Sequence, residues 1–260
     1  MSDKYYDWVT LERHILNDEK FIEIKIITDL IKELKQHKRT LMPDETAYYR
    51  ARLINKEDKE KLNSLLNNND FYGFPASECG APPTNKVLKG GRCNKANESV
   101  LYLAEDAYTA LAEVRPGKRQ RVNIAEFRLR KCVNVIDIIY EDKIPYSLYS
   151  WASFYFYIVH NDNEEYEEYY KISRYITDLI KGLGFDGIRY SSSLSSGGIN
   201  MVLFDPTVAE CINSKIYQTM ALLYYAEEQL PRRNNERLLP KSITSKFPDN
   251  EINQFLKKFK

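Results

Sequence analysis

Apolar residues recur at helical spacing in three parts of the chain. Over residues 21–37 they fall three or four positions apart, which is the spacing of one buried helix face. This face comprises Ile27, Leu30, Ile31 and Leu34. A shorter helix is predicted from Asp106, which can cap its start, to Val114. The longest is predicted over residues 164–183, where Ile172, Ile176, Leu179 and Leu183 keep the helical spacing. Gly184 stands where the glycine cap of this helix belongs.

Short segments that alternate between apolar and polar residues, or that are mainly apolar, predict strands between these helices. The strand candidates are YYRARLI over residues 48–54, Val100–Ala104, Arg121–Leu129, Val133–Ile138, Gly187–Tyr190 and Ile199–Phe204. Residues 151–159 are aromatic and fit a helix or a strand. Strands and helices in this irregular order predict an α+β fold rather than a doubly wound parallel sheet.

The ends of the chain differ in pattern from its middle, which predicts three regions. These are an N-terminal helical extension over residues 1–44, a main domain over 45–219, and a C-terminal helix with a polar tail over 220–260. The first helix is expected to run into KELKQHKRT and stop near Pro43, and the last to cover Met220–Gln229. Segment 55–70 is expected to be a short helix or loop, and 77–94 a long loop of the kind that often carries function.

Composition and charge narrow the classes of function. The chain has 38 basic and 37 acidic side chains, so no electrostatic argument favours a nucleic-acid partner. No secretory signal and no apolar run of about 18 residues is found, so we expect a cytoplasmic protein without a membrane span. Its four cysteines form no CxxC pair and are expected to be reduced thiols.

The sequence has no common cofactor or metal motif in the context that such a motif requires. There is no GxGxxG after a strand, no phosphate-binding GxxxxGK[ST] loop and no GxSxG. No HExxH or Cys/His cluster occurs among only three histidines, so neither a metal site nor a bound cofactor is expected.

The stretch GGRCNKANESVLYLAEDAYTALAEVRP brings three polar residues around one strand–helix corner. Arg92 lies in a glycine turn, where the backbone can approach a ligand closely. Tyr102 is expected on the strand face opposite Leu101 and Leu103. Glu113 lies off the apolar helix face. Taken singly, a surface ion pair, a ring at the core edge and a solvated carboxylate explain them equally well.

Several separated blocks together resemble the RES domain family over about residues 46–215. They are YYRAR, ECGAPP, GGRCN, LYLAEDAYTALAEVRP, VNIAEFRLR, VNVIDI and GFDGIRYSSSLSSGGINMVLFDP, in this order. The resemblance implies a fold like that of ADP-ribosyltransferases, with mixed sheets and surrounding helices. It also implies an enzyme that cleaves the nicotinamide–ribose bond of NAD+ by hydrolysis or phosphorolysis. Family members of this kind are typically toxins that an antitoxin neutralises.

The same resemblance assigns the site residues. The catalytic set it implies is Arg92, Tyr102, Glu113 and Ser192, with Ser191 and Ser193 as adjacent alternatives for the serine. The substrate-binding set is Arg50, Asn94 and Asn200. NAD+ is then the substrate rather than a cofactor, and a cognate antitoxin is an expected partner. Helix 21–37 has three open roles: binding that antitoxin, binding a second protomer, or packing on the domain.

The chemistry of NAD+ cleavage suits these residue types. Loss of neutral nicotinamide leaves a cationic, oxocarbenium-like ribose, which a carboxylate such as Glu113 can stabilise. Guanidinium groups of Arg92 and Arg50 can hold the pyrophosphate. The Tyr102 ring can stack on nicotinamide, and Ser192 can donate a hydrogen bond. Transfer of ADP-ribose to a macromolecule, and NAD+ binding without turnover, are the alternatives.

Overall fold

The computed structural model describes residues 3–17, 24–55, 58, 72–141, 147–158, 166–221, 225–227 and 242–244. Most of segment 55–70, for which a short helix or loop is predicted, lies outside these residues. The chain divides into two compact units, one of Met1–Pro116 with Gln120–Gln218 and one of Gly117–Arg119 with Thr219–Lys260.

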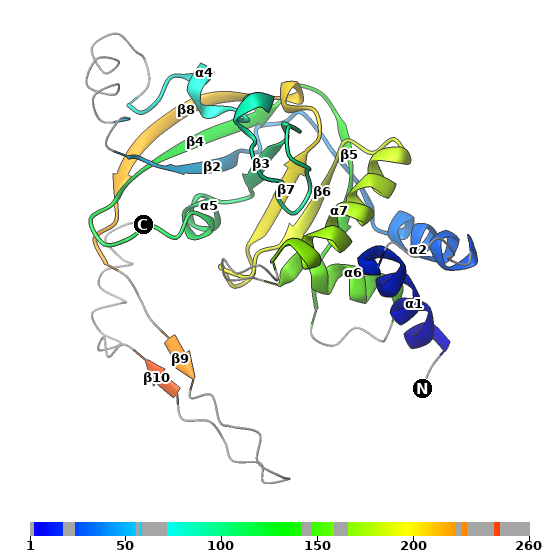
Figure 1. Cartoon of the computed structure of the whole chain (residues 1–260). Helices are drawn as coiled ribbons and strands as arrows, with labels where there is room; N and C mark the ends of the chain where they lie inside the picture. Colours follow the sequence, from blue (N-terminus) through cyan, green and yellow to red (C-terminus); the bar gives the residue numbers. More distant parts are fainter. Residues whose placement is uncertain are drawn as a thin grey trace. The chain divides into compact units, whose positions relative to one another are not determined.

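The first unit is built on an eight-stranded mixed sheet (Figure 1). Its strands are β1 (Lys38–Leu41), β2 (Tyr48–Leu53), β3 (Leu101–Ala104), β4 (Arg121–Leu129), β5 (Val133–Ile138), β6 (Gly187–Ser191), β7 (Ile199–Leu203) and β8 (Ala209–Gln218). They lie in the order β1-β5-β6-β7-β3-β2-β4-β8. The pair β5–β6 is parallel and the other neighbouring pairs are antiparallel. The predicted α+β class is therefore confirmed.

Four helices gather beside β5 and β6 and cover one core (Figure 1). They are α1 (Asp3–Asn17), α2 (Ile24–Gln36), α6 (Leu148–Tyr157) and α7 (Tyr166–Gly182). Leu30 and Leu34 of α2 are fully buried in this core together with Ile136 of β5. Helix α2 thus packs on β5, while α1 packs on α6 and α7. Packing on the domain is one of the three roles considered for helix 21–37. The buried face of α2 includes Ile26, while Ile27 and Ile31 are half-buried.

A second core lies on the other face of the sheet, beside the short helix α4 (Ala76–Cys79). The alternation of β3 separates the two cores. Leu101 and Leu103 belong to the second core, whereas Tyr102 packs against the first. The predicted orientation of Tyr102, opposite its two leucine neighbours, is confirmed.

Helix α5 (Ala107–Glu113) follows β3 and begins as predicted. The carboxylate of Asp106 accepts the backbone N–H of Thr109 at 2.8 Å, which satisfies one of the free donors at the helix start. The aromatic segment 151–159, which was ambiguous, forms most of helix α6 in its described part. Gly184 has φ +79, the left-handed conformation expected of a glycine that ends a helix.

Three predictions about helices and strands were wrong or incomplete. The first helix ends at Gln36, and Lys38–Leu41 pair with β5 instead of extending the helix to Pro43. Strand β8 was not predicted, because AECINSKIYQ shows no clear alternation. In the second unit, Tyr225–Glu227 form a strand that pairs with Ser242–Thr244, where a helix over Met220–Gln229 was expected. Pairing with a distant segment overrides weak local preference at all three sites.

Two negative findings concern only the described residues. None of their helices is long and apolar enough to cross a membrane. Nor do these residues contain a cluster of three or more His, Cys, Asp or Glu side chains that could hold a metal ion.

Candidate functional site

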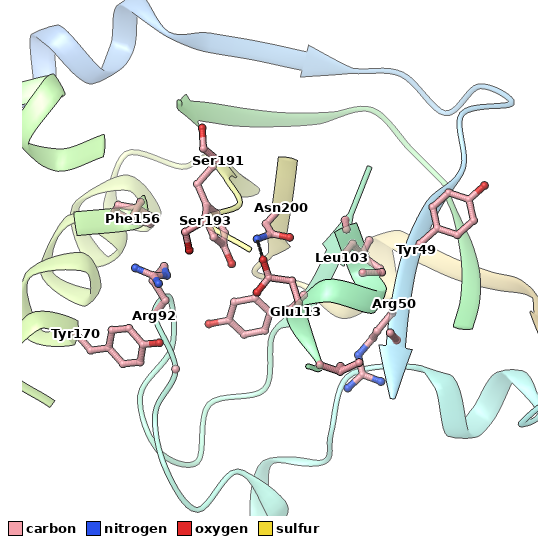
Figure 2. A pocket seen from close by; sticks show the side chains of 17 residues that line it. Tyr49, Arg50, Arg92, Leu103, Glu113, Phe156, Tyr170, Ser191, Ser193 and Asn200 are labelled. Atoms are coloured by element: carbon pink, nitrogen blue, oxygen red, sulfur yellow. Dashed lines mark hydrogen bonds between the residues drawn. The ribbon is translucent and has the colours of Figure 1, made fainter. Parts of the chain in front are cut away.

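A cavity of about 330 Å³ opens among β2, β3, β6 and β7, with α5, α6 and α7 around it (Figure 2). Five of the seven predicted site residues line it: Arg50, Arg92, Tyr102, Glu113 and Asn200. The other two, Asn94 and Ser192, are buried directly behind its wall. Residues that are up to 150 positions apart in the sequence therefore meet at one place.

Glu113 is the last residue of α5 and presents its carboxylate to the cavity. Its Oε1 accepts hydrogen bonds from Ser192 Oγ at 2.7 Å and from Asn200 Nδ2 at 2.6 Å, the latter drawn in Figure 2. Its Oε2 accepts no hydrogen bond from the described part of the chain, and the side chain is exposed. The carboxylate is thus oriented through one oxygen and open to a ligand through the other.

The three adjacent serines differ in their surroundings. Ser192 is 4% exposed, and its hydroxyl is the one that donates to Glu113. Ser191 Oγ accepts the backbone N–H of Tyr140 at 3.0 Å, and Ser191 and Ser193 line the cavity. In the structure Ser192 bonds to the Glu113 carboxylate, and Ser191 and Ser193 lie on the cavity wall. The sequence could not distinguish these roles because the three serines are adjacent.

Arg92 is held by the end of helix α6. Its two terminal nitrogens donate to the carbonyl oxygens of Tyr155 at 2.6 Å and Ile158 at 2.7 Å. These carbonyls carry the partial negative charge of a helix C-terminus. The guanidinium also lies 5.3 Å from the centre of the Tyr170 ring and 5.9 Å from that of Tyr190. Since a guanidinium has five N–H donors, three remain for other acceptors.

Tyr102 and Asn94 together shape the glycine turn that carries Arg92. The Tyr102 hydroxyl donates to Asn94 Oδ1 at 2.9 Å and accepts the Cys93 N–H at 2.9 Å. Asn94 Oδ1 also accepts the Gly91 N–H at 3.1 Å. A Cβ at Gly91 would lie 2.8 Å from the Tyr102 hydroxyl oxygen, so this approach requires glycine. Burial raises the pKa of Tyr102 well above its ordinary value, so its phenol stays protonated.

Asn94, which was predicted to bind substrate, uses its side chain within the turn. Its Nδ2 donates to the carbonyls of Lys95 at 3.0 Å and Glu98 at 3.1 Å, while its Oδ1 accepts the two bonds described above. A primary amide has two N–H donors and one oxygen, so these four bonds leave little capacity for a ligand. The structure places Asn94 in the scaffold that positions Arg92.

Arg50 lies on β2, and Figure 2 shows Glu113 between it and Arg92 in that view. Its guanidinium donates to the Cys79 carbonyl at 3.0 Å. Burial, followed by the nearby charge of Arg52, lowers the pKa of Arg50 from its ordinary value. A partly desolvated cation of this kind favours an anionic partner more strongly than one in water.

Sequence reasoning missed the aromatic part of the cavity. Phe156 of α6, Tyr170 of α7 and Tyr190 of β6 line it, and burial raises the pKa of Tyr190 well above its ordinary value. The only signal was the high tyrosine content, 20 of 260 residues, which does not indicate which rings meet. Such rings give a flat ligand apolar faces beside the two arginines.

The fold and cavity define an α+β domain with an oriented carboxylate in a cavity that two arginines also line. The RES domain family model matches residues 72–223, so the chain belongs to the RES domain family. The match includes six of the predicted site residues, whereas Arg50 and the N-terminal helices lie before it. It begins and ends later than the span of about 46–215 expected from the sequence.

Among curated proteins, no match is found. One solved structure that resembles the chain is described as the M. tuberculosis MbcT–MbcA toxin–antitoxin complex. The identity is 12% and the TM-score 0.41, over 74% of this chain and 92% of the other.

Proposed function

We propose that this chain cleaves the nicotinamide–ribose bond of NAD+. The observation that carries the proposal is the hydrogen bonding of the two carboxylate oxygens of Glu113. One of its carboxylate oxygens is held by Ser192 and Asn200, and the other is open at a cavity lined by Arg50 and Arg92. Membership of the RES domain family supports the same chemistry.

In the proposed reaction, the bond between the ribose C1′ and the nicotinamide nitrogen breaks. Nicotinamide leaves with the electron pair as a neutral molecule, and the ribose becomes an oxocarbenium-like cation. The negative charge of Glu113 stabilises this cation more than it stabilises the bound substrate, which is the condition for catalysis. The hydrogen bonds from Ser192 and Asn200 keep the carboxylate in place during this step.

The two arginines suit the remainder of the substrate. The three N–H groups of Arg92 that are not bonded to α6 can reach a pyrophosphate oxygen, and Arg50 supplies a second cation. The rings of Phe156, Tyr170 and Tyr190 offer faces for the nicotinamide. The phenol of Tyr102 acts through the turn that presents Arg92.

The acceptor completes the reaction by forming a bond from its oxygen to C1′ and losing a proton. With water the product is ADP-ribose, and with inorganic phosphate it is ADP-ribose carrying a new phosphate at C1′. Assays with and without phosphate, with the products separated, distinguish the two. If labelled NAD+ leaves its ADP-ribose on protein or nucleic acid, the enzyme is a transferase instead.

The direct test compares nicotinamide release by the native chain and by Glu113→Gln. This substitution keeps the size of the side chain and removes the charge, so the rate should fall at least about a hundredfold. The control is Glu210→Gln on β8, which removes an exposed carboxylate that pairs with Arg130. This variant should keep the native rate. Native turnover in Glu113→Gln would refute the role of the carboxylate.

The second part of the proposal is that the chain acts as a toxin. Family resemblance supports a chain that depletes NAD+ in the cytoplasm and that a cognate antitoxin inhibits. Expression of the native chain should lower cellular NAD+ and stop growth, and expression of Glu113→Gln should do neither. Equal growth arrest by both chains would separate any toxicity from NAD+ cleavage.

A further inference from the structure

Helix α5 contacts the loop over residues 191–198, here called the serine loop, at two points. The first is the hydrogen bond from Ser192 to Glu113 at the end of the helix. The second lies one turn earlier, where the hydroxyl oxygens of Thr109 and Ser195 are 3.1 Å apart. Thr109 is 0% exposed and Ser195 6% exposed, so this second contact is sealed from water.

The second contact also involves the carboxylate of Asp106. The Thr109 hydroxyl lies 2.6 Å from Asp106 Oδ2 and donates to it. The same hydroxyl also donates to Ser195 Oγ at 3.1 Å. Because a hydroxyl carries one proton, the Thr109 proton is shared between the Asp106 carboxylate and Ser195 Oγ, and this contact holds the Ser195 side chain against α5.

Ser195 in turn determines the direction of the Ser192 hydroxyl. The backbone N–H groups of Leu194 and Ser195 donate to Ser192 Oγ at 3.2 Å and 3.1 Å. These two N–H groups use the lone pairs of the Ser192 hydroxyl oxygen, so the hydroxyl donates its single proton to Glu113. The loop closes through the Gly198 N–H, which donates to the Ser195 carbonyl at 2.9 Å.

The close approach of the loop to α5 depends on Gly198. A Cβ at this position would lie 2.4 Å from Thr109 Oγ1 and 2.8 Å from the Ser195 Cβ. Real Cβ atoms do not come this near to other heavy atoms, so the loop could not reach Thr109 with a larger residue. The contact is therefore a feature of the backbone path as well as of two side chains.

We infer that the Thr109–Ser195 hydroxyl pair is a positioning device that holds the Ser192 hydroxyl on Glu113 for the proposed NAD+ cleavage. The inference rests on that proposed function. Neither residue lines the cavity, so both act through Ser192 and not on the substrate. Loss of the pair should consequently lower kcat and leave KM nearly unchanged, because a displaced carboxylate loses transition-state stabilisation more than binding.

Three substitutions test the pair in the full chain. Ser195→Ala removes the tether but leaves the bond of Thr109 to Asp106, so the cap of α5 is kept. Thr109→Val keeps the shape of the side chain and removes its hydroxyl. In Ser195→Ala, kcat for nicotinamide release should fall about tenfold with KM within about twofold, since one buried hydrogen bond is lost. Thr109→Val also loses the bond to Asp106, so its kcat should fall at least as far, again with KM within about twofold. Thr109→Ser keeps the hydroxyl and should restore most of the turnover that Thr109→Val loses.

A matched control exists elsewhere in the chain. Thr207 donates its hydroxyl to Asp205 at 2.7 Å and its N–H to the same carboxylate oxygen at 2.9 Å, which closely resembles the Asp106–Thr109 arrangement. It is exposed, and its hydroxyl bonds to Asp205 and not to the serine loop. Thr207→Val should keep the native kcat and KM.

Amide hydrogen exchange provides a measurement that needs no activity. The N–H groups of Leu194 and Ser195, both bonded to Ser192 Oγ, should exchange about tenfold faster in Ser195→Ala than in the native chain. Unchanged exchange, or native kcat in both Ser195→Ala and Thr109→Val, would overturn the positioning role. If the native chain releases no nicotinamide, the proposed function fails, and the exchange result alone decides whether the pair holds the loop.

Discussion

The hydroxyl of Ser192 donates to Glu113 Oε1 at 2.7 Å, although the two residues are 79 positions apart in the sequence. Helix α5 supplies the carboxylate, and the loop between the neighbouring strands β6 and β7 supplies the hydroxyl. Strand β7 also pairs with β3, the strand that leads into α5, so the sheet order brings the two segments together. The site is therefore a product of strand pairing.

Replacing Ser192 should affect turnover more than replacing either adjacent serine. Ser192→Ala removes a donor to Glu113 and should lower kcat about 10- to 150-fold, because a hydrogen bond to a charged group contributes about 1.5–3 kcal/mol. Ser193→Ala removes a hydroxyl from the cavity wall and should lower kcat less. Steady-state nicotinamide release measures both, and a larger loss in Ser193→Ala would reassign the serine.

Removal of one oxygen from Tyr102 tests the scaffold of the glycine turn. In Tyr102→Phe the Cys93 N–H and Asn94 Oδ1 lose a partner, so the free energy of unfolding should fall by about 1–3 kcal/mol. KM for NAD+ should rise as the turn that carries Arg92 loosens. Denaturant unfolding and steady-state kinetics measure the two effects.

The control for Tyr102→Phe is Tyr108→Phe on α5. The ring of Tyr108 is 69% exposed, so the same chemical change should alter the free energy of unfolding by less than about 0.5 kcal/mol. If both variants unfold at the same denaturant concentration as the native chain, the hydroxyl of Tyr102 has no structural role.

The N-terminal helices should contribute to the stability of the whole first unit. Leu30 is fully buried between α2 and the sheet, so Leu30→Ala should cost about 2–5 kcal/mol. Ile24→Ala on the same helix, at a side chain that is 81% exposed, should cost less than about 0.5 kcal/mol. Equal unfolding midpoints for the two variants would mean that α2 is docked too weakly to matter.

Tyr155 links helix α1 to the cavity. Tyr155 donates its hydroxyl to Glu12 of α1 at 2.7 Å, while its carbonyl accepts from Arg92. Tyr155→Phe should therefore raise KM modestly if α1 steadies this end of α6. Unchanged KM and unchanged unfolding would confine α1 to a packing role.

Cys93 gives the unfolding equilibrium a dependence on alkaline pH. Burial raises the pKa of its thiol from 9.0 to about 12. Between these values the unfolded chain releases the proton while the folded chain keeps it, so stability that is complete below pH 9 is lost as the pH rises. The free energy of unfolding should fall by about 1.4 kcal/mol per pH unit from this group.

Substitution of the cysteine isolates that contribution. Cys93→Ser removes the titrating group, so denaturant unfolding between pH 9 and 11 should show a shallower dependence than in the native chain. Cys132→Ser, at an exposed position, should leave the native slope unchanged. Parallel slopes for the native chain and Cys93→Ser would show that the thiol does not titrate in this way.

Local patterns predicted the elements that lie near the cavity but not their edges. Asp106 as a cap, the alternation of Tyr102 with Leu101 and Leu103, and Gly184 as a helix end are all seen. Strand β8 was missed because AECINSKIYQ shows no clear alternation and its pairing partner β4 lies 80 to 97 positions earlier. Pairing energy of this kind has no signal within a short window of sequence.

The sequence by itself determined the α+β class, the helix that carries Glu113, the turn that presents Arg92 and the family to which the chain belongs. Only the tertiary structure decided which serine bonds to Glu113, that Asn94 lies in the scaffold, and that Arg92 is held by carbonyls of α6. The physical reason is that helix phase and strand alternation are set within a few residues. Hydrogen-bond partners are set by the sheet order, which brings distant segments within 3 Å of each other.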